Sequence, residues 1–134
     1  MRSAEFAIHT GPRRGLFDIT AECERFVAGG GDGLLNVFVP HATAGVVIME
    51  LGSGTDDDLT GALERLLPHD DRWRHRHGSP GHGADHILPL LVAPSVTVPV
   101  RGGHIRLGTW QSIAVVDPNV DNGSRTVVLT FHDA

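Results

Sequence analysis

The chain has 134 residues, a formal net charge of −5 and 40% hydrophobic residues. This length is typical of one domain with a sizeable core, which we expect to span residues 1–134. The acidic balance argues against a nucleic-acid-binding protein, which would carry a basic surface. No apolar run reaches the roughly 18 residues of a membrane helix, and no apolar segment typical of a signal peptide follows the first residues. We therefore expect neither nucleic acid nor membrane as a partner.

The use of a few residue types limits the chemistry further. Cys23 is the single cysteine, so no internal disulfide can form, and we expect a protein of the reducing cytoplasm. All side chains of the Lys and Arg class are arginine, which excludes Schiff-base chemistry at a lysine and the lysine of a phosphate-binding P-loop. Tyrosine is also absent, so no tyrosyl group acts as an acid or base.

The first elements along the chain are a strand and a short helix. The apolar pattern predicts the strand over residues 4–9, and Asp18 or Thr20 can cap the helix that follows. One side of this helix carries Ile19, Cys23, Phe26 and Val27. We expect Cys23 to be a core residue rather than a nucleophile. The glycine-rich residues 29–33 follow a helix and precede a strand, the wrong order for a phosphate-binding loop, and are predicted to form a turn.

Two apolar strands and a longer helix come next. The strands are predicted over residues 34–39 and 46–49, with Pro40 after the first and Glu50 at the end of the second. The helix opens with three acidic residues, which suit the positive end of a helix dipole. They are Asp56, Asp57 and Asp58. Its apolar stripe comprises Leu59, Ala62, Leu63, Leu66 and Leu67, and Pro68 ends the helix.

The second half of the chain is rich in predicted strands. Apolar runs predict strands over residues 87–92, 96–100, 105–116 and 126–131, with a hairpin turn at residues 101–104. Two helices among about seven strands are typical of an α+β domain with mainly antiparallel strands. No linker or internal repeat marks a second domain.

Histidine is concentrated in one segment. Five of the nine histidines lie between residues 69 and 86, where glycines and a proline predict a loop rather than a helix. Neutral imidazole is the commonest metal ligand, and His75 and His77 share one face of an extended backbone. His82 and His86 have helical spacing, but flanking glycines disfavour a helix there. The segment is a candidate metal site, and the alternative is a solvated surface loop.

Three polar residues interrupt apolar strands or their ends. His41 lies between two predicted strands, Glu50 ends a strand, and Gln111 lies within a long one. A buried imidazole or carboxylate at such a place must be paired or must bind something. These residues are therefore candidates for a functional site.

Six short motifs follow one another in order along the chain. They are Asp18–Thr20; residues 40–44 with the run to Glu50; Trp73 and His75, the latter eleven residues before His86; Pro94–Ser95 with residues 98–100; residues 107–111; and Ser124–Arg125. In this combination the chain resembles the YjbQ family, small proteins also named secondary thiamine-phosphate synthases. The resemblance covers nearly the whole length and implies an α+β fold, a homotrimer and a site near the subunit boundary.

The resemblance also implies roles for individual residues. The family's histidines match His41, His75 and His86, which we expect to bind one divalent metal, with zinc the best-suited ion. The catalytic positions carried over are His41, Glu50, Asp57 and Gln111, and Arg125 is expected to bind a phosphate or pyrophosphate. The aspartate is matched to Asp57 or Asp58 only within one residue. The family often has Asn or Asp where this chain has His82, and His77 has no counterpart.

Three functional hypotheses follow. The first is an enzyme of the thiamine-phosphate synthase type, which joins a pyrimidine pyrophosphate to a thiazole phosphate and releases pyrophosphate. An arginine, a histidine or a divalent metal would stabilise that leaving anion. The second is a non-catalytic trimer that binds a metal or a phosphate. The third is a plain trimer whose histidines pack at its interface without a metal.

Overall fold

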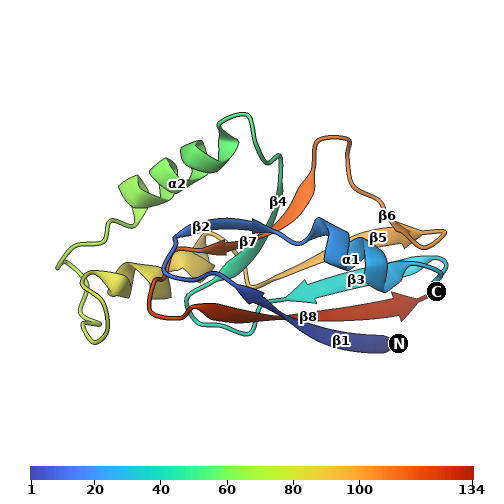
Figure 1. Ribbon diagram of the computed structural model, residues 1–134, viewed down its shortest axis with the longest axis horizontal. Helices are drawn as coiled ribbons and strands as arrows, with labels where there is room; N and C mark the ends of the chain where they lie inside the picture. Colours follow the sequence, from blue (N-terminus) through green and yellow to red (C-terminus); the bar gives the residue numbers. More distant parts are fainter.

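Eight strands form two antiparallel sheets in the computed structural model, which describes all residues from Met1 to Ala134. The five-stranded sheet has the order β1-β8-β3-β5-β6, and the three-stranded sheet has the order β2-β7-β4 (Figure 1). The first sheet contains β1 (Arg2–His9), β8 (Ser124–Asp133), β3 (Gly33–Phe38), β5 (Ser95–Arg101) and β6 (His104–Ile105). The second contains β2 (Gly15–Asp18), β7 (Ser112–Asp117) and β4 (Gly45–Met49).

Four helices complete the fold. They are the α-helices α1 (Thr20–Val27) and α2 (Thr55–Leu66) and the short 3₁₀ helices η1 (His82–His86) and η2 (Leu88–Leu90). None of them has the length and apolar character that a membrane crossing requires. The two α-helices confirm the sequence prediction, and the domain is of the α+β class.

The main core lies where the two sheets and α1 face one another. The inward side chains of β8 alternate with outward ones, as a strand requires, and Val127, Leu129 and Phe131 are buried. The same core contains Val115 of β7 and Cys23 of α1. Burial, followed by repulsion from neighbouring carboxylates, raises the pKa of the Cys23 thiol to about 12. Cys23 is therefore an inert core residue, as its place on the apolar side of the helix predicted.

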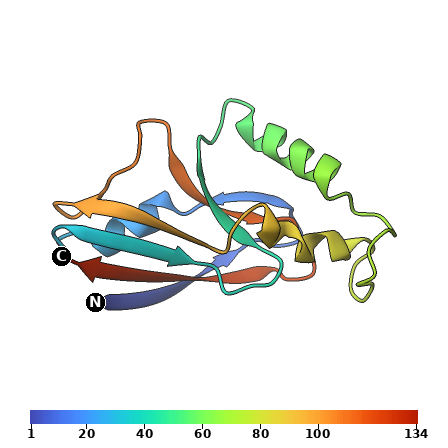
Figure 2. The ribbon, with the colours of Figure 1, turned by 180° about the vertical axis from the view of Figure 1, so that it is seen from behind.

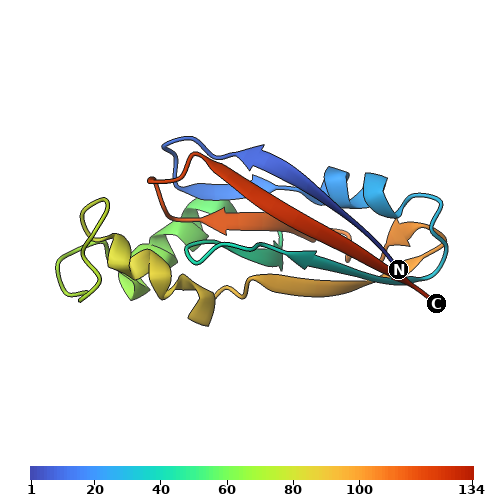
Figure 3. The same cartoon turned by 90° about the horizontal axis from the view of Figure 1, so that it is seen from below.

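A second, smaller core holds the histidine-bearing segment against the second sheet. Its buried members are Leu67, Ala84, Leu88, Val92 and Val116, and Leu59 and Leu63 of α2 pack against it. No residue of α2 is itself fully buried, and the helix stands on the outside of the molecule (Figures 1 and 2). The segment of residues 67–92 lies at the end of the molecule opposite the two chain termini (Figure 3).

One predicted strand is wrong, a second is interrupted, and one strand was not predicted. Residues 87–92 contain η2, because a short apolar run does not distinguish a strand from a buried helical turn and Pro89 suits the start of a helix. Residues 105–116 are interrupted by a turn in which the N–H of Gln111 donates to the Gly108 carbonyl at 3.0 Å. The unpredicted strand is β2, whose four residues pair with β7.

Candidate metal centre

Two glycines allow η1, which begins at His82 and ends at His86, to form. Gly81 precedes the helix with a φ of 77°, a left-handed conformation that side chains disfavour. A Cβ added at Gly83 would meet Trp73 Cβ at 2.5 Å and the His75 carbonyl oxygen at 2.7 Å. The prediction that these glycines disfavour a helix is therefore wrong. They allow a tight 3₁₀ turn that lies against the irregular residues 73–75.

Trp73 fixes the preceding part of the segment. Its indole N–H donates to the carbonyl of Pro68 at 2.8 Å, and its ring packs against the smaller core. Because Gly83 lies directly against Trp73 and the backbone of His75, the side chain of His75 reaches the same region as those of η1. His75 and the histidines of η1, which lie on separate turns of the same segment, are thus brought together.

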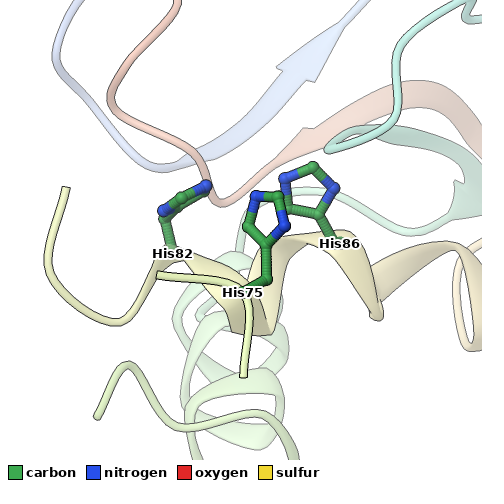
Figure 4. Close-up of side chains that lie close together, drawn as sticks. All are labelled: His75, His82 and His86. Carbon is green, nitrogen blue, oxygen red and sulfur yellow. The ribbon is translucent and has the colours of Figure 1, made fainter. Parts of the chain in front are cut away.

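Three imidazoles converge at this place (Figure 4). The ring centroids are 4.1 Å apart for His75 and His86, 4.9 Å for His75 and His82, and 5.3 Å for His82 and His86. One ligand nitrogen from each ring lies within 4.8 Å of the other two. A tetrahedral zinc with bonds of about 2 Å holds its ligands ~3.3 Å apart, so small ring rotations bring these nitrogens to bonding distance.

His82 is the most firmly held of the three. Only 4% of it is exposed, and its Nδ1 lies 3.2 Å from the Ser79 carbonyl oxygen. A carbonyl oxygen only accepts a hydrogen bond, so Nδ1 carries the proton and Nε2 presents its lone pair. This hydrogen bond to a carbonyl is the usual support of a metal-binding histidine. His82 therefore has the tautomer and orientation that a ligand needs.

The pKa values of the other two histidines favour the same form. Removal from water, followed by repulsion from the neighbouring imidazoles, lowers the pKa of His75 below its ordinary value. Removal from water, followed by the charge of His82, lowers the pKa of His86. The neutral imidazole that results is the form that binds a metal.

An anchoring network holds η1 to the rest of the molecule. The buried Asp85 carboxylate accepts a hydrogen bond from Asn119 Nδ2 at 2.9 Å and pairs with His69 Nε2 at 2.5 Å. The other ring nitrogen of His69 lies 2.8 Å from Glu64 Oε1. The hydrogen bond with Asp85 is the main reason that the pKa of His69 is raised. Since Asp85 precedes His86, this network fixes the backbone beside a ligand.

The turn after β7 makes a second attachment. Asp121 Oδ2 accepts hydrogen bonds from the backbone N–H of Ser79 at 3.2 Å and from its hydroxyl at 3.1 Å. These bonds, led by the one from the backbone, lower the pKa of the Asp121 carboxyl. The loop that orients His82 is thus tied to the sheet, and a polar cleft of about 260 Å³ opens beside His75.

His41 is not a member of this group within one chain, and the predicted triad of His41, His75 and His86 stays a prediction. Its Nε2 accepts a hydrogen bond from the backbone N–H of Thr126 at 2.8 Å. Burial, followed by the charge of Arg125, lowers the pKa of His41. The third member of the group is His82. Its spacing to His86 is visible in the sequence, but the flanking glycines predicted that no helix forms there.

The predicted residues Glu50, Asp57 and Gln111 lie elsewhere. Met49 of β4 pairs with Ser112 of β7. Glu50 directly follows Met49, and Gln111 directly precedes Ser112, so both lie at the same end of the sheet. Asp57 lies in the first turn of α2, which begins at Thr55. All three side chains are exposed.

The opposite end of the same sheet carries the histidine cluster. There β7 ends at Asp117, and the turn that follows it holds Ser79 through Asp121. Six strand residues span about 20 Å. One chain therefore does not bring Glu50 and Gln111 to the three imidazoles.

Arg125 is buried and is hydrogen-bonded to protein groups through Nε and Nη2. Its Nε and Nη2 donate to the two carboxylate oxygens of Asp117 at 2.8 and 2.9 Å, and Nη2 also donates to Thr43 Oγ1 at 2.8 Å. Only 3% of Arg125 and 0% of Asp117 is exposed. The expectation that Arg125 binds an anion gains no support from this placement.

The fold and the cluster together define a small α+β protein with a candidate metal centre on a loop at one end. Residues 4–134 match the family described as UPF0047 protein YjbQ-like. The chain belongs to this family, which confirms the resemblance seen in the sequence. It is 62% identical over 119 residues to the UPF0047 protein Mb2586c of Mycobacterium bovis, covering 89% of this chain and 92% of that protein.

More distant relatives share the full length. A UPF0047 protein of Archaeoglobus fulgidus is 34% identical over 124 residues, covering 92% of this chain and 97% of that protein. The crystal structure of a hypothetical protein from Aeropyrum pernix has a TM-score of 0.89 and 30% identity over 100% of both chains. An uncharacterized YjbQ/UPF0047 protein of Clostridium acetobutylicum has a TM-score of 0.87 and 26% identity, covering 96% of this chain and 99% of that one. These names state a family and no activity.

Proposed function

We propose that this protein binds one divalent metal ion through His75, His82 and His86, and that zinc is the best-suited ion. The observation that carries the proposal is the convergence of three imidazole nitrogens within 4.8 Å. The proton on His82 Nδ1 and the lowered pKa values of the other two support it, because each ligand must be neutral. Three nitrogen ligands are typical of zinc sites that keep a further position.

We further propose that the metal centre acts on a small phosphorylated substrate. A bound divalent ion would supply a positive charge that stabilises a phosphate or pyrophosphate leaving group. The chain itself holds the imidazoles in place through Ser79 and through the anchoring network around Asp85. The polar cleft beside His75 gives space for a polar part of a substrate. The transfer expected from the family resemblance, from a pyrimidine pyrophosphate to a thiazole phosphate, would take place here.

A homotrimer would account for the two separated groups of expected site residues. Large apolar side chains are exposed in the single chain, among them Leu90 at 82% and Trp110 at 75%. Burial of such side chains between subunits favours association. Trp110 adjoins Gln111 at the end of the sheet that also carries Glu50, while Leu90 lies in η2 close to the histidine cluster. Association of these two ends would place Glu50 and Gln111 of one subunit beside the imidazoles of the next.

The metal is tested first. Elemental analysis of the freshly purified chain should find one divalent ion per chain, and dialysis against a chelator should remove it. A substitution of His86 by alanine should abolish retention, whereas His104→Ala should leave it unchanged because His104 is exposed in the β5–β6 hairpin. Metal-free protein that takes up no zinc on titration would contradict the metal site.

The activity and the assembly need separate measurements. Metal-loaded protein should release pyrophosphate from the pyrimidine pyrophosphate and thiazole phosphate pair, and chelated protein should not. Metal binding without this release would favour the non-catalytic alternative. Light scattering should show a trimer. If active sites are shared, a mixed trimer of Glu50→Ala and His86→Ala chains should recover activity that neither variant has alone.

A further inference from the structure

A fourth imidazole lies beside the three that form the metal centre. The ring centroid of His77 is 4.0 Å from that of His75 and 5.2 Å from that of His82. These separations resemble those within the three-histidine group, which run from 4.1 to 5.3 Å. Four imidazoles around one tetrahedral ion, each bound at about 2 Å, have ring centres ~5 Å apart.

The backbone places His77 firmly at this position. A Cβ added at the next residue, Gly78, would meet His82 Cε1 and Asp121 Oδ2, each at 2.9 Å. The chain around His77 is therefore pressed against the ring of His82. Gly78 has a φ of 87°, a conformation that glycine adopts without strain. His77 also follows His75 by two residues, so that both side chains can leave an extended backbone on one face.

The side chain of His77 is free to move toward an ion. It is exposed and makes no side-chain hydrogen bond, in contrast to His82, whose Nδ1 is engaged by Ser79. Its nitrogens do not belong to the set that lies within 4.8 Å, so a rotation of the side chain is needed. The ring is exposed, and its aromatic neighbours are the imidazoles of His75 and His82.

We propose that His77 is a fourth nitrogen ligand, which occupies the position that the other three histidines leave open. This inference rests on the proposed metal centre and adds a consequence for it. With His77 bound, the ion has four protein ligands, as in a closed structural site. A phosphate group must then displace His77 to reach the ion. The exposed and otherwise unattached imidazole is suited to such an exchange.

Cobalt titration of metal-free protein tests the proposal, because the visible spectrum of Co²⁺ reports the number and kind of its ligands. Wild-type protein should give the spectrum of a tetrahedral site with four nitrogens. His77→Ala should bind Co²⁺ and Zn²⁺ about tenfold more weakly or worse, which corresponds to roughly 1.4 kcal/mol or more, and its spectrum should show a water ligand. Inorganic phosphate should alter the spectrum of His77→Ala at lower concentrations than that of the wild type.

His132→Ala is the matched control, because His132 is an exposed histidine at the far end of β8. It should match the wild type in all three measurements, and thermal unfolding of the metal-free proteins should show that His77→Ala remains folded. Equal affinity, spectrum and phosphate response in wild type and His77→Ala would overturn the role of His77 while leaving the three-histidine site intact. Wild-type protein that binds neither ion would overturn both.

Discussion

The ring centroids of the His75 and His86 imidazoles lie 4.1 Å apart, although the two residues are eleven positions apart in the chain. Trp73 and Gly83 cause this approach, since the helix that carries His86 packs without a side chain against the residues that carry His75. Both residues were among the three histidines predicted to bind one metal, and both belong to the group that could hold one. The arrangement of the two imidazoles therefore depends on Trp73 and Gly83, which are not themselves ligands.

The first prediction concerns the identity of the third ligand. Alanine at His75, His82 or His86 should weaken zinc binding by more than about tenfold, because even the loss of a residue that only supports a ligand costs about 10–100-fold. His41→Ala should retain zinc, since His41 Nε2 is hydrogen-bonded to Thr126 outside the group. Isothermal titration of the metal-free variants measures the four affinities.

The control for this set is His9→Ala, which changes an exposed histidine at the end of β1. A His82→Ala protein that binds zinc as tightly as the His9→Ala protein would exclude His82 as a ligand. Loss of zinc from His41→Ala would instead restore the triad that the sequence motifs predicted, with ligands shared between subunits.

The second prediction concerns Gly83. In Gly83→Ala the new methyl group meets Trp73 Cβ and the His75 carbonyl oxygen at 2.5 and 2.7 Å, so η1 and residues 73–75 must move apart. Overpacking of this kind costs about 1–3 kcal/mol of unfolding free energy, and zinc binding should weaken with it. Urea unfolding and zinc titration of the same variant check both effects.

Gly61→Ala provides the contrast. Gly61 lies inside α2, and a Cβ there meets only the end of the flexible Arg65 side chain, at 3.4 Å. Alanine is the better helix former, so this change should stabilise the protein by about 0.5–1 kcal/mol and leave zinc binding unchanged. If Gly83→Ala behaves in the same way, the close contact with Trp73 does not constrain the site.

The third prediction is a pH dependence of stability that comes from His69. Its hydrogen bond with Asp85 raises its pKa above the ordinary value near 6.5. The protonated ring is therefore favoured in the folded state, and its stabilising contribution is complete below about pH 6.5. It is lost as the pH rises through the raised folded-state pKa. Thermal unfolding across this range should show the loss, and His69→Gln should lack it.

His104→Gln serves as the comparison, because it removes a histidine that is mostly exposed. The difference in Tm between wild type and His69→Gln should reach its full size below about pH 6.5, where a free histidine is also charged, and should shrink at higher pH. A difference that stays constant or grows with pH would show that His69 does not stabilise the fold through its charge.

The fourth prediction separates a structural from an anion-binding role for Arg125. Removal of its side chain in Arg125→Ala leaves the Asp117 carboxylate buried without a counter-charge, which costs about 3–5 kcal/mol. Arg125→Lys keeps the charge but loses the planar two-pronged contact, so it should lose a smaller part of the stability. Chemical unfolding measures both. An Arg125→Lys protein of unchanged stability and weaker phosphate binding would support the anion-binding role instead.

Much of the fold was readable from local patterns. The stripe from Leu59 to Leu67 predicted α2, the apolar side with Cys23 predicted α1, and an apolar run predicted residues 126–131 of β8. These patterns are reliable because helices and strands bury one face with a fixed period. Two apolar stretches were misassigned, one wholly and one in part. An apolar run alone neither distinguishes a strand from a buried helical turn nor locates a break within it. Residues 87–92 form a 3₁₀ turn, and residues 105–116 break at the Gly108–Gln111 turn.

The sequence alone also indicated the family, located the histidine-rich segment and predicted that His75 and His86 lie close together. Tertiary structure decided the rest. Burial and the Ser79 carbonyl make His82 a ligand candidate, while the Thr126 N–H occupies His41. The length of β7 keeps Glu50 and Gln111 at the far end of the sheet from the imidazoles. Motifs in the sequence indicate candidate residues, but distances across a sheet are fixed only when the strands pair, at about 3.3 Å per residue.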